Sequence, residues 1–340
     1  MSHTKNPLAG WKIEPNSVEW VGRNLSRLEC IIAQRDGTLI VADPRSSITK
    51  ISQSGEQTLL PSLKEIQQKE PSQVGKSMPT GKVPNGIALG AEGNIFIADI
   101  GVGTIDKLSP NGILQTLFSE IDGRPLGKAN YVMIDSKGRL WVTVSTRLDP
   151  WSAAMRPDVG DGFIALVEDG RLRIVADDIA FANEVKFDAK EEWLYVVETA
   201  RKRVSRFKVD QKGDLNSREI YGPASLGIGF PDGIAFDSYG NLWCTMIFAD
   251  RVIAITPDQE VLELLNEGNP VGNKAMEDEY AQGRGLSESV LDMTGGKIAP
   301  WTTSVTFGGP DLKTVYLGSL KGTQLPAFRS PVAGLAMSHW

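Results

Sequence analysis

One sequence unit recurs along this chain of 340 residues, and the recurrence limits the folds that it can adopt. Each copy begins with a polar residue, continues with alternating apolar positions, turns at or near a glycine and ends in a second β-rich run. The copies span residues 28–44, 84–101, 129–145, 182–199, 231–247 and 303–319. Alternation with a period of two is typical of half-buried strands. The chain is therefore predicted to consist of repeated β units.

Each copy is followed by a weaker pair of β-rich runs, as at residues 104–118 and 251–265. The repeat therefore contains four short strands and recurs at a period of roughly 50 residues, which is typical of propeller blades. A single four-stranded unit cannot bury both faces of its sheet, so the blades must close into a ring. We predict an all-β fold, a six-bladed β-propeller, and one domain over residues 1–340.

Three stretches are longer than a blade requires and are predicted as inserted loops: residues 61–82, 146–161 and 266–300. Loops of this length in a compact domain are often functional. We expect Trp151 and Met155 of the second insert to be walls of a binding pocket. A helix is predicted near 274–282 in the third insert.

Charge and hydropathy restrict the partners and the compartment. The 42 acidic residues outnumber the 36 basic ones, giving a net charge of −6 without a basic stripe, so a nucleic-acid partner is not expected. No run of 18 apolar residues occurs and the N-terminus has no apolar segment, so we expect neither membrane insertion nor secretion. Cys30 and Cys244 are too few for a disulfide framework and are expected as small buried hydrophobes. A cytoplasmic location is predicted, and the oligomeric state is left open.

Histidine is nearly absent, which restricts the chemistry. His3 and His339 are the two histidines, each within three residues of a terminus. Termini are usually frayed, so neither residue is a good candidate for a positioned base or ligand. This argues against Ser-His-Asp, Cys-His and histidine-ligated zinc sites. An enzyme built on this chain is expected to use carboxylates, amides, lysines or a hard metal ion.

The polar residues that open the repeats are predicted to meet in space. The innermost strand of every blade runs beside the central axis, so its first residue lies at one mouth of the axial channel. The six opening residues are Glu29, Asn85, Asn130, Asn183, Asp232 and Ser304. In one blade such residues are ordinary turn formers. When they converge on one axis, oxygen ligands without histidine or cysteine favour a hard cation, with Ca²⁺ as the first candidate.

At these positions the sequence resembles the senescence-marker-protein/gluconolactonase family of regucalcin-like proteins. The resemblance is carried by FANEVKFD and LYVVETARKRVSRF within 181–207, FPDGIAFDSYGNLWCT at 230–245, and TSVTFGGPDLKTVYLGS at 303–319. It implies a six-bladed propeller with one divalent ion at the axis, Ca²⁺ first and Mg²⁺, Mn²⁺ or Zn²⁺ as alternatives. The ligands that it implies are Glu29, Asn130, Asn183 and Asp232.

The resemblance also suggests residues that bind substrate. Lys128 lies two residues before Asn130, where regucalcin-like members have a substrate-binding arginine. Asn85 on the ring and Tyr131 beside it are further candidates for substrate binding. Tyr131 is itself a departure, because many relatives have aspartate there. Cys30-Ile31 after Glu29 is another, because the usual family sequence is E-G-P.

The predicted function is that of a calcium-dependent hydrolase of the gluconolactonase type. Its substrate would be a small molecule, a lactone of a sugar acid or similar small hydroxy acid. Asp232 is the catalytic candidate, as general base for water or as nucleophile. Two alternatives stay open: a non-catalytic ligand-binding propeller with a structural Ca²⁺ ion, and a metal-using enzyme of another reaction type on the same scaffold.

Overall fold

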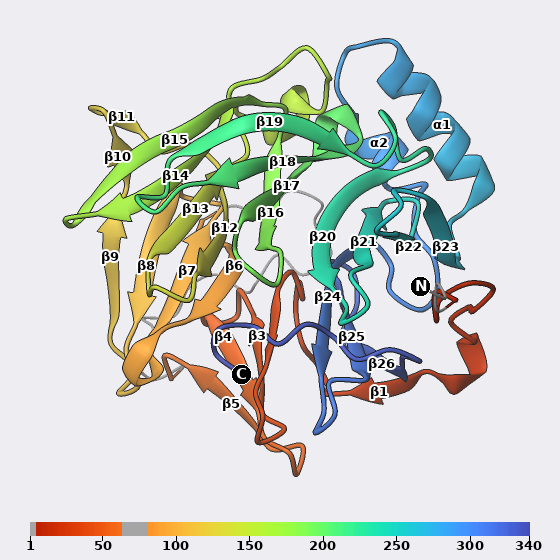
Figure 1. The fold of residues 1–340 in the computed structure, drawn as a ribbon, viewed down its shortest axis with the longest axis horizontal. Coiled ribbons are helices and arrows are strands. Elements are labelled where there is room, and N and C mark those ends of the chain that lie inside the picture. The colour runs from red at the N-terminus through yellow and green to blue at the C-terminus, as the bar shows by residue number, and fades with distance from the viewer. Residues whose placement is uncertain (1–4, 63–80) are drawn as a thin grey trace.

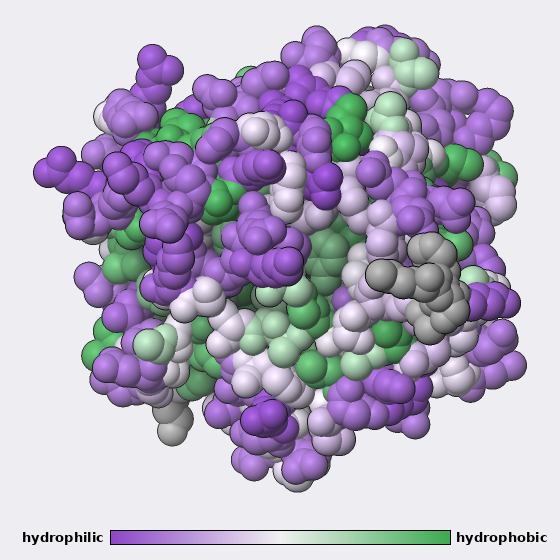
Figure 2. Space-filling view, in the orientation of Figure 1, coloured by the Kyte–Doolittle hydropathy of each residue, from purple (hydrophilic) through white to green (hydrophobic). Residues whose placement is uncertain are grey.

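The computed structural model describes residues 5–62 and 81–340 and forms six four-stranded antiparallel sheets around a central axis (Figure 1). This arrangement confirms the predicted all-β, six-bladed propeller. The insert at 61–82 lies almost entirely outside the described residues. Apolar and pale residues gather near the middle of the face in Figure 2, inside a mostly hydrophilic border.

The first five blades follow the chain, and each runs from an inner to an outer strand. The first contains β2 (Ile31–Ala33), β3 (Leu39–Ala42), β4 (Ile48–Ile51) and β5 (Gln57–Leu60). The second contains β6 (Pro84–Leu89), β7 (Ile95–Asp99), β8 (Thr104–Leu108) and β9 (Leu114–Phe118). The third contains β12 (Ala129–Ile134), β13 (Leu140–Val144), β14 (Gly162–Glu168) and β15 (Arg171–Ile179). The fourth contains β16 (Ala182–Phe187), β17 (Trp193–Glu198), β18 (Arg203–Val209) and β19 (Leu215–Tyr221). The fifth contains β20 (Phe230–Phe236), β21 (Leu242–Ile247), β22 (Arg251–Ile255) and β23 (Val261–Asn266).

The sixth blade is assembled from both ends of the chain. Its inner strands are β24 (Thr302–Gly308), β25 (Thr314–Ser319) and β26 (Leu325–Arg329), and its outermost strand is β1 (Glu19–Val21). Glu19 pairs with Ala327 and Val21 with Leu325. The N-terminal strand therefore joins the last blade and closes the ring. A short hairpin of β10 (Glu120–Ile121) and β11 (Arg124–Pro125) lies between the second and third blades.

The core follows from the repeat. Inner strands such as β16 and β20 are buried along their whole length, because they pack against neighbouring blades on both sides. Trp141 and Trp243, at matching positions of two blades, are fully buried. Each donates its indole N–H to an aspartate of the preceding turn, Asp135 at 2.9 Å and Asp237 at 3.0 Å. The N–H donor of each large buried indole is therefore paired.

The third insert forms two helices at one edge of the ring (Figure 1). They are α1 (Pro270–Ala281) and α2 (Glu288–Leu291). The predicted helix near 274–282 is confirmed and begins earlier, because Asn269 caps it: its side chain accepts from the N–H groups of Val271 and Gly272. Among the described residues no helix is both long and apolar enough to span a bilayer.

Candidate active site

Of the six opening residues, five line one cavity at a mouth of the axial channel, and Ser304 lies outside the cavity lining, beside Gly233. All are buried, from 1% exposed for Asn85 and Ser304 to 8% for Glu29. Asn85, Asn130 and Asn183 are second in their strands, Asp232 is third, and Glu29 lies just before β2. Charged and amide groups at this depth require partners or a ligand.

Register shifts aim these side chains at the axis. Five of the inner strands lose register with their neighbour next to the opening residue: at Pro84/Ile87, Ala129/Tyr131, Ala182/Val185, Pro231/Ile234 and Thr302/Val305. Such β-bulges turn a side chain away from the regular alternation. Two of them contain a glycine at a close approach: a Cβ on Gly86 would lie 2.5 Å from Tyr131 Cα, and one on Gly233 would lie 2.4 Å from Thr303 O.

Three oxygen atoms of the ring are buried without a hydrogen-bond partner among the described residues. They are Glu29 Oε2, Asn130 Oδ1 and Ser304 Oγ. Buried polar atoms are nearly always paired, so Glu29 Oε2 and Asn130 Oδ1, which line one cavity, are suited to contact a ligand there. Residues 5–62 and 81–340 contain no cluster of three or more His, Cys, Asp or Glu positioned for a metal. The ring instead offers two carboxylates together with amide and hydroxyl oxygens, which suits a hard cation.

Other hydrogen bonds hold the ring in shape. Asn85 Nδ2 donates to Glu29 Oε1 at 3.2 Å, and Arg27 Nη2 donates to Asn85 Oδ1 at 3.2 Å. Both ends of Asn85 are therefore engaged, and this residue orients Glu29. Asn183 Nδ2 donates to Asp232 Oδ1 and, at 3.2 Å, to Thr199 Oγ1. The Asn183 carbonyl oxygen consequently faces away from Asp232.

The ring concentrates negative charge in a buried place. Burial raises the pKa of Asp232 well above its usual range, and Glu29 and Glu184 raise it further. Burial also raises the pKa of Glu29, with Glu184 adding to the effect and Arg27 opposing it. Lys186 Nζ lies 3.3 Å from Glu184 Oε2 and partly compensates. A cation bound between the two carboxyls would favour their ionised form and offset this effect.

A cavity of about 470 Å³, including its open mouth, lies above the ring. Its floor contains Glu29, Asn85, Asn130, Asn183 and Asp232, with Arg27 and Thr199 beside them. Its wall is apolar and contains Ile100, Trp151, Met155, Phe181, Ile247, Phe248, Trp301 and Leu320. The prediction that Trp151 and Met155 form pocket walls is confirmed.

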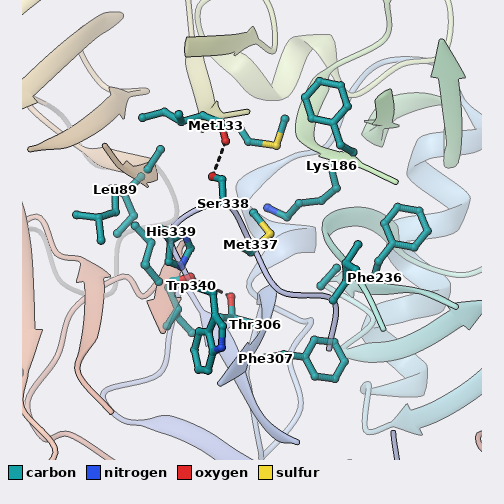
Figure 3. A pocket seen from close by; sticks show the side chains of 18 of the residues that line it. Leu89, Met133, Lys186, Phe236, Thr306, Phe307, Met337, Ser338, His339 and Trp340 are labelled. Atoms are coloured by element: carbon teal, nitrogen blue, oxygen red, sulfur yellow. Dashed lines mark hydrogen bonds between the residues drawn. The ribbon is translucent and has the colours of Figure 1, made fainter. Parts of the chain in front are cut away.

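Two predicted substrate-binding residues lie outside this cavity. Lys128 Nζ pairs with Asp149 Oδ1 at 3.1 Å. The hydroxyl of Tyr131 accepts from Lys186 Nζ, and the tyrosine lines a second cavity at the other end of the inner strands. Figure 3 shows that second cavity, in which Met337, Ser338, His339 and Trp340 of the C-terminal segment lie beside Met133 and Lys186. His3 lies outside the described residues.

Sequence reasoning missed Arg27, Glu184 and Lys186. Arg27 had a signal, because it precedes Glu29 by the same two positions that separate Lys128 from Asn130. Glu184 and Lys186 also showed a signal in the sequence, because these two charged residues alternate with apolar residues in a strand that is buried throughout. Cys30 and Cys244 are free and buried as predicted, and burial raises the pKa of the Cys30 thiol to about 12.

Residues 111–268 match a family model described as SMP-30/gluconolactonase/LRE-like region, which confirms the predicted resemblance. A 6-deoxy-6-sulfogluconolactonase of Pseudomonas putida is 25% identical over 181 residues, covering 51% of this chain and 52% of the relative. A gluconolactonase of Zymomonas mobilis is 26% identical over 227 residues, covering 60% and 62%. The aligned part therefore spans about half to three-fifths of these relatives. The structure of a calcium-binding protein, regucalcin, from Agrobacterium tumefaciens superposes with a TM-score of 0.63 at 16% identity, covering 93% of this chain and 95% of that one, and shows the shared fold.

Proposed function

Because residues 111–268 form a region of the SMP-30/gluconolactonase/LRE-like family, we propose that this protein is a divalent-metal-dependent lactonase. The preferred ion is Ca²⁺, and the substrate is a lactone of a sugar acid or similar small hydroxy acid. The observation that carries the proposal is the pair of buried oxygens, Glu29 Oε2 and Asn130 Oδ1, that line an open cavity and have no hydrogen-bond partner among the described residues. The lactonase names of two relatives support the reaction class.

The residues present fit a divalent cation. Glu29, Asn130, Asn183 and Asp232 would hold it, and two oxygens of their side chains have no hydrogen-bond partner within residues 5–62 and 81–340. A bound divalent ion supplies Lewis acidity at the lactone carbonyl and stabilises the charge that develops on its oxygen. Asn85 and Arg27 keep Glu29 in position through the hydrogen bonds described above.

The chain itself supplies the base. Asp232 Oδ1 accepts from Asn183 Nδ2, which fixes the plane of the carboxylate and leaves its second oxygen to take a proton from water. Water adds to the acyl carbon, the acyl–oxygen bond of the ring breaks, and the ring oxygen takes up a proton as a hydroxyl. The product is a hydroxy acid, which ionises to its carboxylate and releases a proton.

Lys128 and Tyr131 remain proposals for substrate binding. Asp149, the partner of Lys128, is 83% exposed at its side chain, so their ion pair is held weakly. Lys128 could therefore turn to a substrate carboxylate or hydroxyl. Tyr131 faces the opposite cavity, so a contact with substrate would require a change at the bulge beside Asn130.

The experiment is a pH-indicator assay of acid release from a panel of lactones, with Ca²⁺ and with a chelator. Elemental analysis of the same preparation is expected to find about one divalent ion per chain, which matches a single oxygen ring. Turnover should vanish with the chelator and return with Ca²⁺. Metal binding without turnover on any lactone would instead favour the non-catalytic alternative. Turnover by protein without a divalent ion would contradict the metal site.

A further inference from the structure

Resting on the proposed lactonase function, we infer which of its two substrate classes fits: a lactone of a small hydroxy acid with an apolar substituent, alkyl or aryl, rather than a polyhydroxylated sugar lactone. The geometry of the cavity carries this inference. The ring at the floor can engage the reacting ester group, whereas any part of the substrate above the ring meets the apolar wall.

Most polar side chains that line the cavity lie at its floor and already form hydrogen bonds within the protein. Thr199 Oγ1 donates to Pro231 O at 2.8 Å and accepts from Asn183. Arg27, the one cation among the described lining residues, donates through Nη2 to Asn85, and its Nε is buried at the floor without a hydrogen-bond partner in the described chain. The indole N–H of Trp301 donates to Thr294 Oγ1 at 3.0 Å and is not offered to a ligand. Above the ring, the apolar wall therefore offers sugar hydroxyls few side-chain partners.

The wall is made by backbone conformations that aromatic residues seldom adopt. Phe181, Phe248 and Trp301 have φ values of +60°, +70° and +57°. Bulky residues in this left-handed region are strained, at about 1–3 kcal/mol each. They lie just before β16, just after β21 and just before β24, yet their side chains meet at one cavity. Strain repeated at three sites around one wall is typical of a functional surface.

The third insert supports this wall from behind. Met276, Leu286 and Leu291 belong to the same buried cluster as Phe181, Phe248 and Trp301. The rings of Phe248 and Trp301 stand edge to face with centroids 5.0 Å apart. Residues 266–300 thus fix the aromatic side chains, and a rigid apolar wall selects ligands by shape and hydrophobicity.

The size of the preference follows from desolvation. A buried hydroxyl without a partner loses about 1–3 kcal/mol. An apolar pocket rejects a ligand with one added hydroxyl by about 10²-fold. We therefore expect kcat/KM for a δ-lactone with an alkyl chain, and for dihydrocoumarin, to exceed that for D-glucono-δ-lactone by about 10²-fold or more.

The test compares these three lactones with the Ca²⁺-saturated protein. In parallel, tryptophan fluorescence measures binding of the ring-opened acids, because Trp151 and Trp301 line the cavity. The alkyl hydroxy acid is expected to bind about 10-fold or more tightly than gluconate. Equal or tighter binding of gluconate, or faster turnover of gluconolactone, would overturn the apolar preference and leave the lactonase function standing. No turnover of any lactone would overturn the function, and the binding series would still decide the preference.

A variant tests whether the apolar wall causes the preference for apolar lactones. Leu320→Gln places a polar group of similar size on a half-buried lining residue. Its kcat/KM for the alkyl lactone should fall about 10-fold, with a smaller change for gluconolactone. Ile220→Gln makes a like change on outer strand β19, where Ile220 is 40% exposed, and should alter neither value. Equal losses for both lactones in Leu320→Gln would contradict the inference, and thermal unfolding checks that both variants fold.

Discussion

The two mouths of the axial channel are built from the same six inner strands and differ in nearly every other respect. At the mouth where these strands begin, the lining is polar, three buried oxygens have no hydrogen-bond partner in the described part of the chain, and a cavity opens to solvent. At the mouth where they end, the lining is apolar, with residues such as Leu89, Phe236 and Phe307, and the C-terminal segment occupies it. The first mouth is suited to bind a ligand, and the second to stabilise the ring.

Hydrogen bonding at the second mouth shows the same contrast. Ser338 Oγ donates to Ile134 O at 2.8 Å, and the N–H of Leu335 donates to Phe236 O at 2.9 Å. Lys186 stands between the two mouths, because its ammonium contacts Glu184 on one side and Tyr131 on the other. Among the described residues, polar groups are paired at the second mouth and partly unpaired at the first, which is why we propose that the strand starts bind the ligand.

The largest expected effect is at the first mouth. Asp232→Asn keeps the shape and an oxygen but removes the charge, so turnover should fall by roughly 10²-fold or more even at saturating Ca²⁺. The measurement is the plateau rate in a Ca²⁺ titration. Thr306→Val, near-isosteric and at the second mouth, serves as the control and should keep its rate. A plateau near the wild-type rate would reduce Asp232 to a ligand.

An acid-dependent effect is expected beside the first mouth, at Glu198. Burial alone would raise its pKa, but the Ser205 hydroxyl and the guanidiniums of Arg203 and Arg218 outweigh burial and lower it to about 2. A carboxyl whose folded pKa is depressed stabilises the fold above its unfolded pKa, and this stability is lost as pH falls from about 4.5 toward 2. The loss should reach roughly 2–3 kcal/mol.

Urea unfolding at pH 7 and pH 3 measures this loss. Glu198→Gln should be less stable than the wild type at pH 7 and should lose less on acidification. Asp311 provides the control: Arg329 likewise lowers its pKa to about 2, but the pair is exposed to solvent. Because solvent screens this exposed pair, Asp311→Asn should lower the stability at pH 7 by less than Glu198→Gln does. If the wild type and Glu198→Gln lost the same free energy of unfolding between pH 7 and pH 3, protonation of Glu198 would not be the cause of the acid destabilisation.

A smaller effect with an unusual sign is expected at Asn130. Because Asn130 Oδ1 has no partner in the described chain, Asn130→Ala should leave the stability of the metal-free protein unchanged or raised. Affinity for Ca²⁺, measured by calorimetry, should fall by about 10-fold or more. Asn241→Ala is the control, because Asn241 is buried and donates to Asp237 Oδ2 at 2.8 Å, so its loss should lower stability. Destabilisation by both variants would argue against a cation at the ring.

The repeat predicted the blades and the ring, because period-two alternation and a recurrent opening residue are local signals. It could not predict the aromatic wall, since Phe181, Phe248 and Trp301 stand at blade ends and converge only after closure of the ring. Tyr131 shows another limit. A bulge between Ala129 and Tyr131 resets the alternation, and a sequence pattern does not show where a bulge falls.

The smallest effect is expected at His339, in the second mouth. Its Nε2 lies 3.2 Å from Ala33 O, and burial lowers the pKa of the imidazole, so the ring is neutral at pH 7. His339→Ala removes one neutral hydrogen bond and should lower stability by about 1 kcal/mol. Turnover and its pH profile should stay as in the wild type, because the side chain lies among the ends of the inner strands and the oxygen ring lies at their starts. Stability is measured by urea unfolding, and turnover by acid release across pH 5–9. A large loss of turnover, or a lost limb of the profile, would mean that the two mouths are coupled through Lys186, and the division of roles between them would fail.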